Sequence, residues 1–219
     1  NAKEEANNNN ITVEVKAPDL CPRYVAHYVK DVKIERSPLW MRRRLKMCGI
    51  NSISTFVDIT NYVLVEMGQP MHAFDMANVA GEKIVVRRAE NGEKIVTLDE
   101  KEFTLNSENL VICDGEKAVA LAGIMGGLNS EIKDTTKNVL FESAKFERGN
   151  IRRSSRALGQ SSDSSHRFEK GVDEFTTGLA IYTAQKFGSG ETEVISRILS
   201  TFLIITGIAA IVIAVVAIT

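Results

Sequence analysis

The segment from Lys83 to Phe146 constrains the fold most strongly, because short apolar stretches alternate there with turn residues. Several of its stretches have the length and composition of β-strands: KIVVRRA, EKIVTLD, KEFTL, NLVICDG, KAVALAG and NVLFESAKF. Asn91-Gly92 and Asp114-Gly115 are dipeptides typical of β-hairpin turns. The segment therefore predicts a body rich in sheet.

The residues before this segment combine one strand pattern with two helix patterns. RYVAHYVKDVKI alternates like a half-buried strand, with Tyr24, Ala26 and Tyr28 on one face. SPLWMRRRLKMCG predicts a helix with Ser37 as its N-cap. FVDITNYVLVEMG predicts a second helix that ends at Gly68, and QPMHAFD is expected to be a tight connector after it.

Two further helices are expected after the strand segment. NIRRSSRALG has Asn150 as a candidate N-cap and Gly159 as its end, and EFTTGLAIYTAQKF is amphipathic. The stretch between them, QSSDSSHRFEKGVD, is expected to be a loop. Because helices and strands occupy separate parts of the chain, the sequence predicts an α+β fold with mixed or antiparallel sheets and flanking helices.

The two ends of the chain differ from this central part. Residues 1–10 contain the polar tract AKEEANNNN and are expected to be a flexible lead-in. Residues 188–219 form an atypical tail, and the last part, 198–219, has no charged residue and is long enough to span a bilayer. That part is a membrane anchor, a buried segment or a terminus foreign to the native protein. One domain is expected over 11–187, and the first residue, Asn, indicates a fragment of a longer protein.

Charge and cysteine content narrow the functional classes. With 27 Lys and Arg against 28 Asp and Glu, the net charge is −1, which excludes a uniformly basic nucleic-acid-binding surface. Phosphate contact stays open at the basic patch of Arg42, Arg43, Arg44 and Lys46, whose alternative is a solvated helix face. The 3 cysteines are far apart and outside Cys-x-x-Cys spacing, which argues against a disulfide framework and against zinc, and fits a reducing cytoplasm.

The sequence lacks the motifs of several common chemistries. It contains no Gly-x-x-x-x-Gly-Lys-Ser/Thr, no Gly-x-Gly-x-x-Gly and no His-Glu-x-x-His, so phosphate loops and zincin chemistry have no anchor. The cluster SDSSH, from Ser162 to His166, holds the residue types of a hydrolase triad. However, triads assemble from separated segments, because neighbouring side chains point in different directions. A polar loop is the simpler interpretation.

Three features remain as candidate site residues. Glu142 lies in the apolar strand VLFESAKF, on the face of Leu140 and Ala144, where a buried carboxylate needs a hydrogen-bond donor; the alternative is an edge position facing water. His72 either braces the connector with Pro70 or takes part in a site. The glycines of ALAGIMGGLNSEI either end a buried strand or leave room for a ligand.

Five long motifs together carry a family resemblance. SPLWMRRRLKMCGI, VDITNYVLVEMGQPMHAFD, ALAGIMGGLNSEI, VLFESAKF and DSSHRFEKGVD occur in the order and spacing of the B3/B4 region of phenylalanyl-tRNA synthetase β subunits. The resemblance runs from about Arg23 to Ala184. It implies an α+β B3/B4 module that carries a hydrolytic editing site.

The resemblance also implies a reaction and partners. The substrate would be tRNA(Phe) mischarged with tyrosine, and water would attack the aminoacyl ester without a covalent enzyme intermediate. The partners would be tRNA(Phe) and the synthetase α subunit, in a heterotetramer of two α and two β chains, with a membrane involved only if the tail is an anchor. ATP and Mg²⁺ would serve the whole synthetase, with no cofactor or metal in this fragment.

Carried over by the same resemblance, the editing pocket falls on eight positions. The catalytic pair would be His72 and Thr60, which position the water or the ester, and Glu142 would accept a hydrogen bond from the tyrosine hydroxyl. The remaining substrate-binding residues would be Ala122, Gly123, Gly126, Ser162 and Ser164. The family usually has threonine near Ser162, so this serine affects pocket shape rather than hydrogen bonding.

Two other functional classes remain open beside editing. The chain could be a module that binds tRNA or an amino acid without catalysis. It could also be a scaffold for subunit contacts, in which case the face of Arg152, Arg153 and Arg156 would be an interface. Selective hydrolysis of a tyrosyl ester would distinguish editing from both.

Overall fold

The computed structural model describes residues 11–128 and 131–188. The strands are β1 Thr12–Val15, β2 Arg23–Val29, β3 Met71–Asp75, β4 Lys83–Arg88, β5 Lys94–Val96, β6 Glu102–Thr104, β7 Leu110–Cys113, β8 Ala118–Leu121, β9 Met125–Gly126 and β10 Val139–Lys145. The helices are α1 Leu39–Met47, α2 Thr55–Met67, α3 Arg148–Leu158, α4 Asp163–Lys170 and α5 Glu174–Gly188, with short 3-10 helices η1 Met76–Asn78 and η2 Ala80–Glu82.

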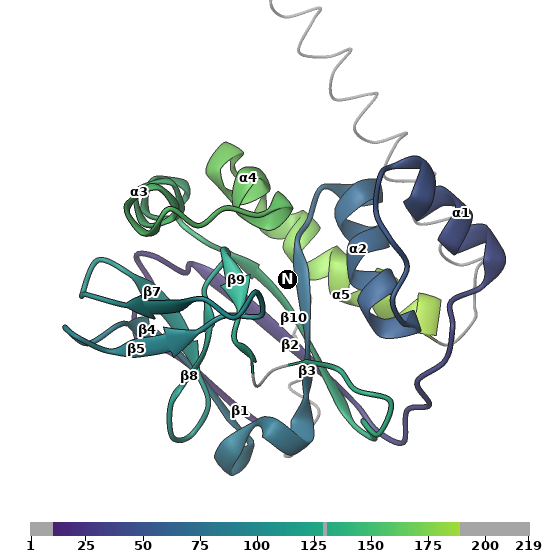
Figure 1. Cartoon of the computed structure of the whole chain (residues 1–219), viewed down its shortest axis with the longest axis horizontal. Coiled ribbons are helices and arrows are strands. Elements are labelled where there is room, and N and C mark those ends of the chain that lie inside the picture. The colour runs from purple at the N-terminus through teal and green to yellow at the C-terminus, as the bar shows by residue number, and fades with distance from the viewer. Residues whose placement is uncertain (1–10, 129–130, 189–219) are drawn as a thin grey trace, which may run out of the picture.

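Two sheets face each other across the middle of the molecule (Figure 1). The larger has the strand order β1-β4-β7-β8-β9, with β1 and β4 parallel and the other pairs antiparallel. The smaller has the antiparallel order β2-β10-β3, and β5 pairs with β6 in a separate hairpin. The predicted α+β class with mixed and antiparallel sheets is confirmed.

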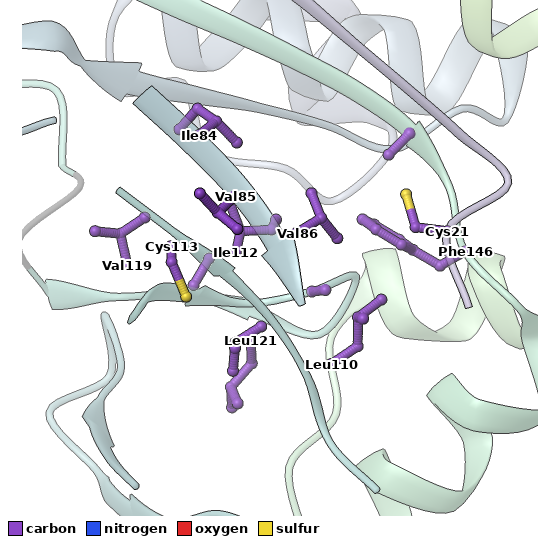
Figure 2. Packing of buried hydrophobic residues seen from close by; sticks show 14 of the residues in the cluster. Cys21, Ile84, Val85, Val86, Leu110, Ile112, Cys113, Val119, Leu121 and Phe146 are labelled. Carbon is purple, nitrogen blue, oxygen red and sulfur yellow. The ribbon is translucent and has the colours of Figure 1, made fainter. Parts of the chain in front are cut away.

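The three-stranded sheet is apolar on both faces and so separates two cores. Leu140 and Ala144 of β10 belong to an inter-sheet core that they share with the five-stranded sheet. Ile84, Val86, Ile112 and Leu121 of this core are shown in Figure 2. Val139 and Phe141 point the other way, into a core shared with helices α1, α2 and α5. Because neighbouring residues of a strand face opposite sides, one apolar strand supplies both layers.

The strand predictions hold in the segment from Lys83 to Phe146, where each predicted stretch contains a strand. Asp114-Gly115 joins β7 to β8, which pair as the predicted hairpin. Asn91-Gly92 does form a turn, but it joins β4 to β5, which do not pair with each other. The hairpin predicted there is wrong, because β4 pairs with β7, a partner distant in sequence.

Two segments expected to be irregular form regular elements. QPMHAFD contains β3, which lies beside the central strand β10 and supplies one edge of its sheet. QSSDSSHRFEKGVD contains α4, which begins at a capping box between Ser162 and Ser165 and ends at Gly171. Both residues of this capping box are serines. The helix start is therefore not predicted, because the usual Glu or Gln at the third helical residue is missing.

The predicted C-terminal ends of the helices agree with the structure better than the predicted N-cap residues do. Gly68 and Gly159 terminate α2 and α3 in the left-handed conformation, as expected, at φ 72° and 61°. Ser37 does not cap α1, since its hydroxyl donates to Asp58 instead. Asn150 does not cap α3, because the side chain of Glu147 accepts from the backbone nitrogens of Gly149 and Asn150.

The predicted lead-in at 1–10 and the apolar segment at 198–219 lie outside the described residues. Among the residues that the structure describes, no helix is long and apolar enough to span a membrane. The ranges 11–128 and 131–188 contain all eight predicted site residues.

Candidate functional site

A cavity of about 450 Å³ opens between strands β3, β8, β9 and β10 and helices α2 and α4. Seven of the eight predicted site residues line it: Thr60, His72, Gly123, Gly126, Glu142, Ser162 and Ser164. They come from separate places in the chain that the fold brings together. Apolar side chains such as Val57, Leu98 and Phe168 cover much of the remaining wall.

Glu142 lies in the middle of the central strand β10 and faces this cavity. Its neighbours in register are Ala26 of β2 and His72 of β3. The side chain is buried, and the hydroxyl of Tyr24 donates a hydrogen bond to its Oε2 atom at 2.8 Å. The face predicted from alternation is confirmed, and the edge position facing water is excluded.

Burial changes the acidity of this carboxyl group. Removal from water raises the pKa of Glu142 to about 7, and the hydrogen bond from Tyr24 opposes that rise. Burial also raises the pKa of Tyr24, with the neighbouring Glu142 charge as a further cause. At neutral pH Tyr24 therefore stays a hydrogen-bond donor, and Glu142 holds its proton to a higher pH than an exposed carboxyl group does.

His72 lies beside Glu142 on the same face of the sheet. Its ring meets the edge of Phe74 at a centroid distance of 4.5 Å. Burial lowers the pKa of His72 to about 4, so the imidazole is neutral at physiological pH. A neutral imidazole carries one donor nitrogen and one acceptor nitrogen, which suits it to orient a water molecule or an ester.

Thr60 reaches the cavity from the buried face of α2. Its hydroxyl donates to the carbonyl oxygen of Val57 at 2.8 Å, one turn earlier in the helix. That bond uses its single proton, so in this conformation the oxygen faces a ligand only as an acceptor. Asn61, the next residue, also lines the cavity and supplies an amide.

Ser162 and Ser164 bring the start of α4 to the cavity. The hydroxyl of Ser162 donates to the carbonyl oxygen of Ile124 at 2.6 Å and accepts from the nitrogen of Ser165 at 3.1 Å. It therefore joins α4 to the turn after β8. No triad forms within SDSSH, because the Ser162 hydroxyl is used in this link and His166 is exposed.

The glycines of the turn differ in which neighbouring atoms exclude a side chain at their position. A Cβ at Gly126 would lie 2.8 Å from Cε1 of His72 and 2.9 Å from Cδ1 of Leu98, both side-chain atoms of residues that line the cavity. A Cβ at Gly127 would lie 2.5 Å from the carbonyl oxygen of Val119, so no side chain fits against strand β8. Gly126 is therefore limited by the site, and Gly127 by the sheet.

Gly123 and Ala122 meet the inter-sheet core. Gly123 has φ +68°, and a Cβ there would point at the rings of Phe146 and Phe168 rather than into open space. The structure places Ala122, the eighth predicted residue, in the core and not among the residues that line the cavity. Of this group, only Gly126 has a polar side chain of the site, His72, packed against the position of its missing Cβ.

Sequence reasoning missed several residues of the site. Alternation places Tyr24 on the correct face of its strand, but the pairing that aligns it with Ala144, two residues after Glu142, is a long-range register. Leu98 comes from a loop without any motif, whereas Glu131 lies within the motif ALAGIMGGLNSEI but is not singled out there. The acidic residue Glu131 adds a second carboxyl at the cavity wall.

Within 11–128 and 131–188, no group of three or more His, Cys, Asp or Glu side chains is arranged to hold a metal ion. The described cysteines, Cys21, Cys48 and Cys113, are all free. Burial raises the pKa of the Cys21 thiol to about 12 and that of Cys113 to about 11, so both stay protonated at neutral pH. Neither of these two thiols is activated for nucleophilic attack.

Comparison with known proteins identifies relatives. The model of the B3/4 domain family matches residues 20–187. The phenylalanine–tRNA ligase beta subunit of Syntrophus aciditrophicus is 54% identical over 162 residues, which are 74% of this chain and 20% of that protein. The beta subunit of Geobacter metallireducens is 56% identical over 161 residues, 74% of this chain and 20% of that protein.

A solved structure also matches at lower similarity. It is an N-terminal fragment of the phenylalanyl-tRNA synthetase beta subunit from Pyrococcus horikoshii, with a TM-score of 0.47 and 16% identity over 69% of this chain and 50% of that chain. The chain spans about a fifth of the length of the curated relatives it matches. On the match of the family model across most of its length, the chain belongs to the B3/4 domain family.

Proposed function

We propose that this chain is the editing part of a phenylalanine–tRNA ligase beta subunit and hydrolyses tRNA(Phe) mischarged with tyrosine. The observation that carries the proposal is the buried carboxyl of Glu142, which faces a cavity of about 450 Å³ beside the neutral imidazole of His72. Cavities of about 300–1,000 Å³ are typical of small-molecule sites.

The physical need for such a site is a limit of hydrophobic selection. A pocket shaped for phenylalanine rejects tyrosine poorly, since tyrosine only adds a hydroxyl group. A second pocket with a buried acceptor selects the other way, because phenylalanine would leave that acceptor without a partner. Glu142 is the acceptor in this proposal. Tyr24 holds one of its oxygens, and the substrate hydroxyl donates to the carboxylate from the cavity.

The reaction is attack of a water molecule on the ester carbonyl between tyrosine and the terminal ribose. The C–O bond to the ribose breaks, the ribose oxygen takes a proton, and tyrosine leaves as a carboxylic acid. His72 orients the water through its acceptor nitrogen, and Thr60 accepts a hydrogen bond from the substrate. The missing side chain of Gly126 lets His72 lie close to the backbone at the cavity. Gly123, Ser162 and Ser164 line the wall around the aminoacyl group, and Ala122 supports that wall from the core.

The remaining expectations concern the whole synthetase. Its alpha subunit and tRNA(Phe) are the proposed partners, in an assembly of two alpha and two beta chains. ATP and Mg²⁺ would serve aminoacylation outside this chain. The proposed location is the cytoplasm.

A deacylation assay tests the proposal against its rivals. The chain is incubated with Tyr-tRNA(Phe) and Phe-tRNA(Phe), and the loss of each ester is followed. Editing predicts selective loss of tyrosine. Survival of both esters together with binding of free tyrosine would identify a binding module, and survival without binding would identify a scaffold.

A further inference from the structure

A second cavity of about 320 Å³ lies beside the first, between α1 and the loop before α2. Its lining residues are Arg36, Arg42, Lys46, Ile50, Asn51, Ser52 and Ile53. Three of these carry a positive charge, and none of them is acidic. Charges of one sign around one space raise the local concentration of anions.

The three cations are not neutralised by the protein. Within the described part of the chain, Arg36, Arg42 and Lys46 form no ion pair, and the Nε atom of Arg42 is buried without a hydrogen-bond partner. The acidic neighbour Glu35 pairs with Lys33 instead. A buried donor without a partner is costly, and an anionic oxygen in the cavity would satisfy it.

The other cations of α1 have different surroundings. Arg44 donates to the hydroxyl of Tyr62 at 2.6 Å and lies over the ring of Trp40. Arg43 is exposed and does not line the cavity. The basic patch of the sequence therefore divides, since Arg42 and Lys46 face the cavity whereas Arg43 and Arg44 do not.

A buried carboxylate fixes the wall opposite α1. Asp58 of α2 is fully buried and accepts hydrogen bonds from the hydroxyls of Ser37 and Ser52 and from the nitrogen of Ile53. Two of these bonds hold Ser52 and Ile53, both of which line the cavity, in place. Asp58 itself does not line the cavity. One carboxylate also cannot balance three cations, so the region of the cavity keeps a net positive charge.

The two cavities meet at Ile53, which lines both. Ile53 is 71% exposed, although it is a large apolar residue. An exposed apolar side chain at this position offers a surface for a ribose or a base. A strand that places its terminal ester in the first cavity would pass over Ile53 and bring a phosphate to the second.

We infer that the cavity of Arg36, Arg42 and Lys46 binds a backbone phosphate of the single-stranded RNA end whose terminal ester enters the first cavity. This inference rests on the proposed editing function for the identity of the strand. Arg42 supplies a planar guanidinium to the phosphate oxygens, and Arg36 and Lys46 supply charge. The contact is independent of base sequence and holds the strand in register with the site.

Binding of RNA tests the inference without requiring hydrolysis. The probe is a fluorescein-labelled single-stranded RNA of about eight nucleotides ending in CCA, and its anisotropy is measured with the full chain over a range of salt concentrations. Arg42→Gln and Lys46→Gln should each weaken binding about tenfold. Each should also make the slope of log affinity against log salt shallower, by at most about 0.7, the value for the one phosphate contact that the three cations share.

Arg43→Gln is the matched control, because it makes the same charge change on the same helix outside the cavity. Equal weakening by Arg43→Gln and Arg42→Gln would overturn the inference, since a general charge effect would then explain both. Circular dichroism melting of each variant separates lost binding from lost folding. If Arg42→Gln fails to fold, Lys46→Gln, an exposed position, decides the result in the same way.

Inorganic phosphate serves as a competitor at constant ionic strength. Weak competition is expected, because the strand also contacts Ile53 and the first cavity. Displacement of the RNA by low millimolar phosphate would assign the cavity to the free ion and overturn the inference.

Hydrolysis separates this inference from the proposed function. Arg42→Gln should lower kcat/KM about tenfold for Tyr-tRNA(Phe) and leave it unchanged for tyrosine ethyl ester, which has no phosphate. If the unmodified chain hydrolyses neither ester, the proposed function fails, while the RNA affinities still decide the phosphate site. An equal loss on both esters would contradict a phosphate contact.

Discussion

The hydroxyl of Tyr24 donates a hydrogen bond of 2.8 Å to Oε2 of Glu142, across two neighbouring strands of the central sheet. Burying a carboxyl group without a hydrogen-bond partner is costly. The bond from Tyr24 gives the buried Glu142 a donor and fixes its orientation. The site therefore contains a prearranged phenol–carboxyl contact beside the cavity that the proposal assigns to a substrate phenol.

Tyr24→Phe should raise the pKa of Glu142 above its value of about 7, because the hydrogen bond that favours the ionised carboxyl is lost. At pH 7 the carboxyl would then be mostly protonated and a poorer acceptor. Infrared titration of the carboxyl band measures the change. Tyr28→Phe, on the same strand and face, should leave the titration unaltered, and an unchanged titration in Tyr24→Phe would show that the hydrogen bond has no influence on Glu142.

The pKa of Glu142 makes folding stability depend on pH. The folded value of about 7 exceeds the reference value of 4.5, so the folded chain holds one more proton between these two pH values. The contribution of Glu142 to the free energy of unfolding is fully present below about pH 4.5. It decreases by about 1.4 kcal/mol per pH unit as the pH rises to about 7. His72→Gln should expose this decrease in urea unfolding measurements from pH 4.5 to pH 7.

His72 has the opposite effect in almost the same range. Its folded pKa of about 4 lies below the reference value of 6.5, so the unfolded chain holds the extra proton between them. The contribution of His72 to the free energy of unfolding is fully present above pH 6.5 and is lost as the pH falls to about 4. The two contributions oppose each other in the unmodified chain, whereas Glu142→Gln should lose stability on acidification. Parallel pH profiles for the two single variants would disprove this balance.

Gly126→Ala should impair hydrolysis with little effect on folding. The added Cβ meets the ends of two side chains, His72 and Leu98, which can move, although His72 then leaves its position. Gly127→Ala should instead lower the free energy of unfolding by about 1–3 kcal/mol, because its Cβ meets the backbone of β8. Urea unfolding and deacylation rates together check the pair.

Gly126→Trp should abolish editing, because the large side chain would fill the cavity, and should leave aminoacylation by the assembled synthetase intact. Full editing in Gly126→Trp would limit that glycine to a structural role.

Ser162→Ala should lower the free energy of unfolding by about 1–3 kcal/mol, since it removes a helix cap and the donor to the carbonyl of Ile124. Ser162→Thr keeps the hydroxyl and should stay close to the unmodified chain. Chemical unfolding of the two variants measures the difference. An unchanged free energy of unfolding in Ser162→Ala would show that the two hydrogen bonds of this hydroxyl do not contribute to stability.

Local patterns predict much of the fold because they depend on neighbouring residues. Alternation places Glu142 on the face of Leu140, and Gly68 and Gly159 mark the ends of their helices. The same patterns fail where a distant partner decides the conformation. The segment at Met71 becomes a strand because β10 lies beside it, and β4 pairs with β7 across the Asn91-Gly92 turn.

The family resemblance selects seven residues that line the cavity, but it does not explain their contacts. Tyr24 lies outside the prediction, since its bond to Glu142 requires a register between strands 118 residues apart in sequence. Ser162 is expected at the substrate, whereas the structure shows its hydroxyl joining α4 to Ile124. The second cavity is also missed, because the sequence does not show which faces of α1 its cations occupy.

The most direct test of the account is the ratio of kcat/KM for Tyr-tRNA(Phe) to that for Phe-tRNA(Phe), measured with and without Glu142→Ala in the assembled synthetase. If Glu142 accepts a hydrogen bond from the tyrosine hydroxyl, the substitution should reduce this ratio about ten- to a hundredfold, the value of one buried bond to a charged group. An unchanged ratio would remove Glu142 from substrate selection and contradict the central claim.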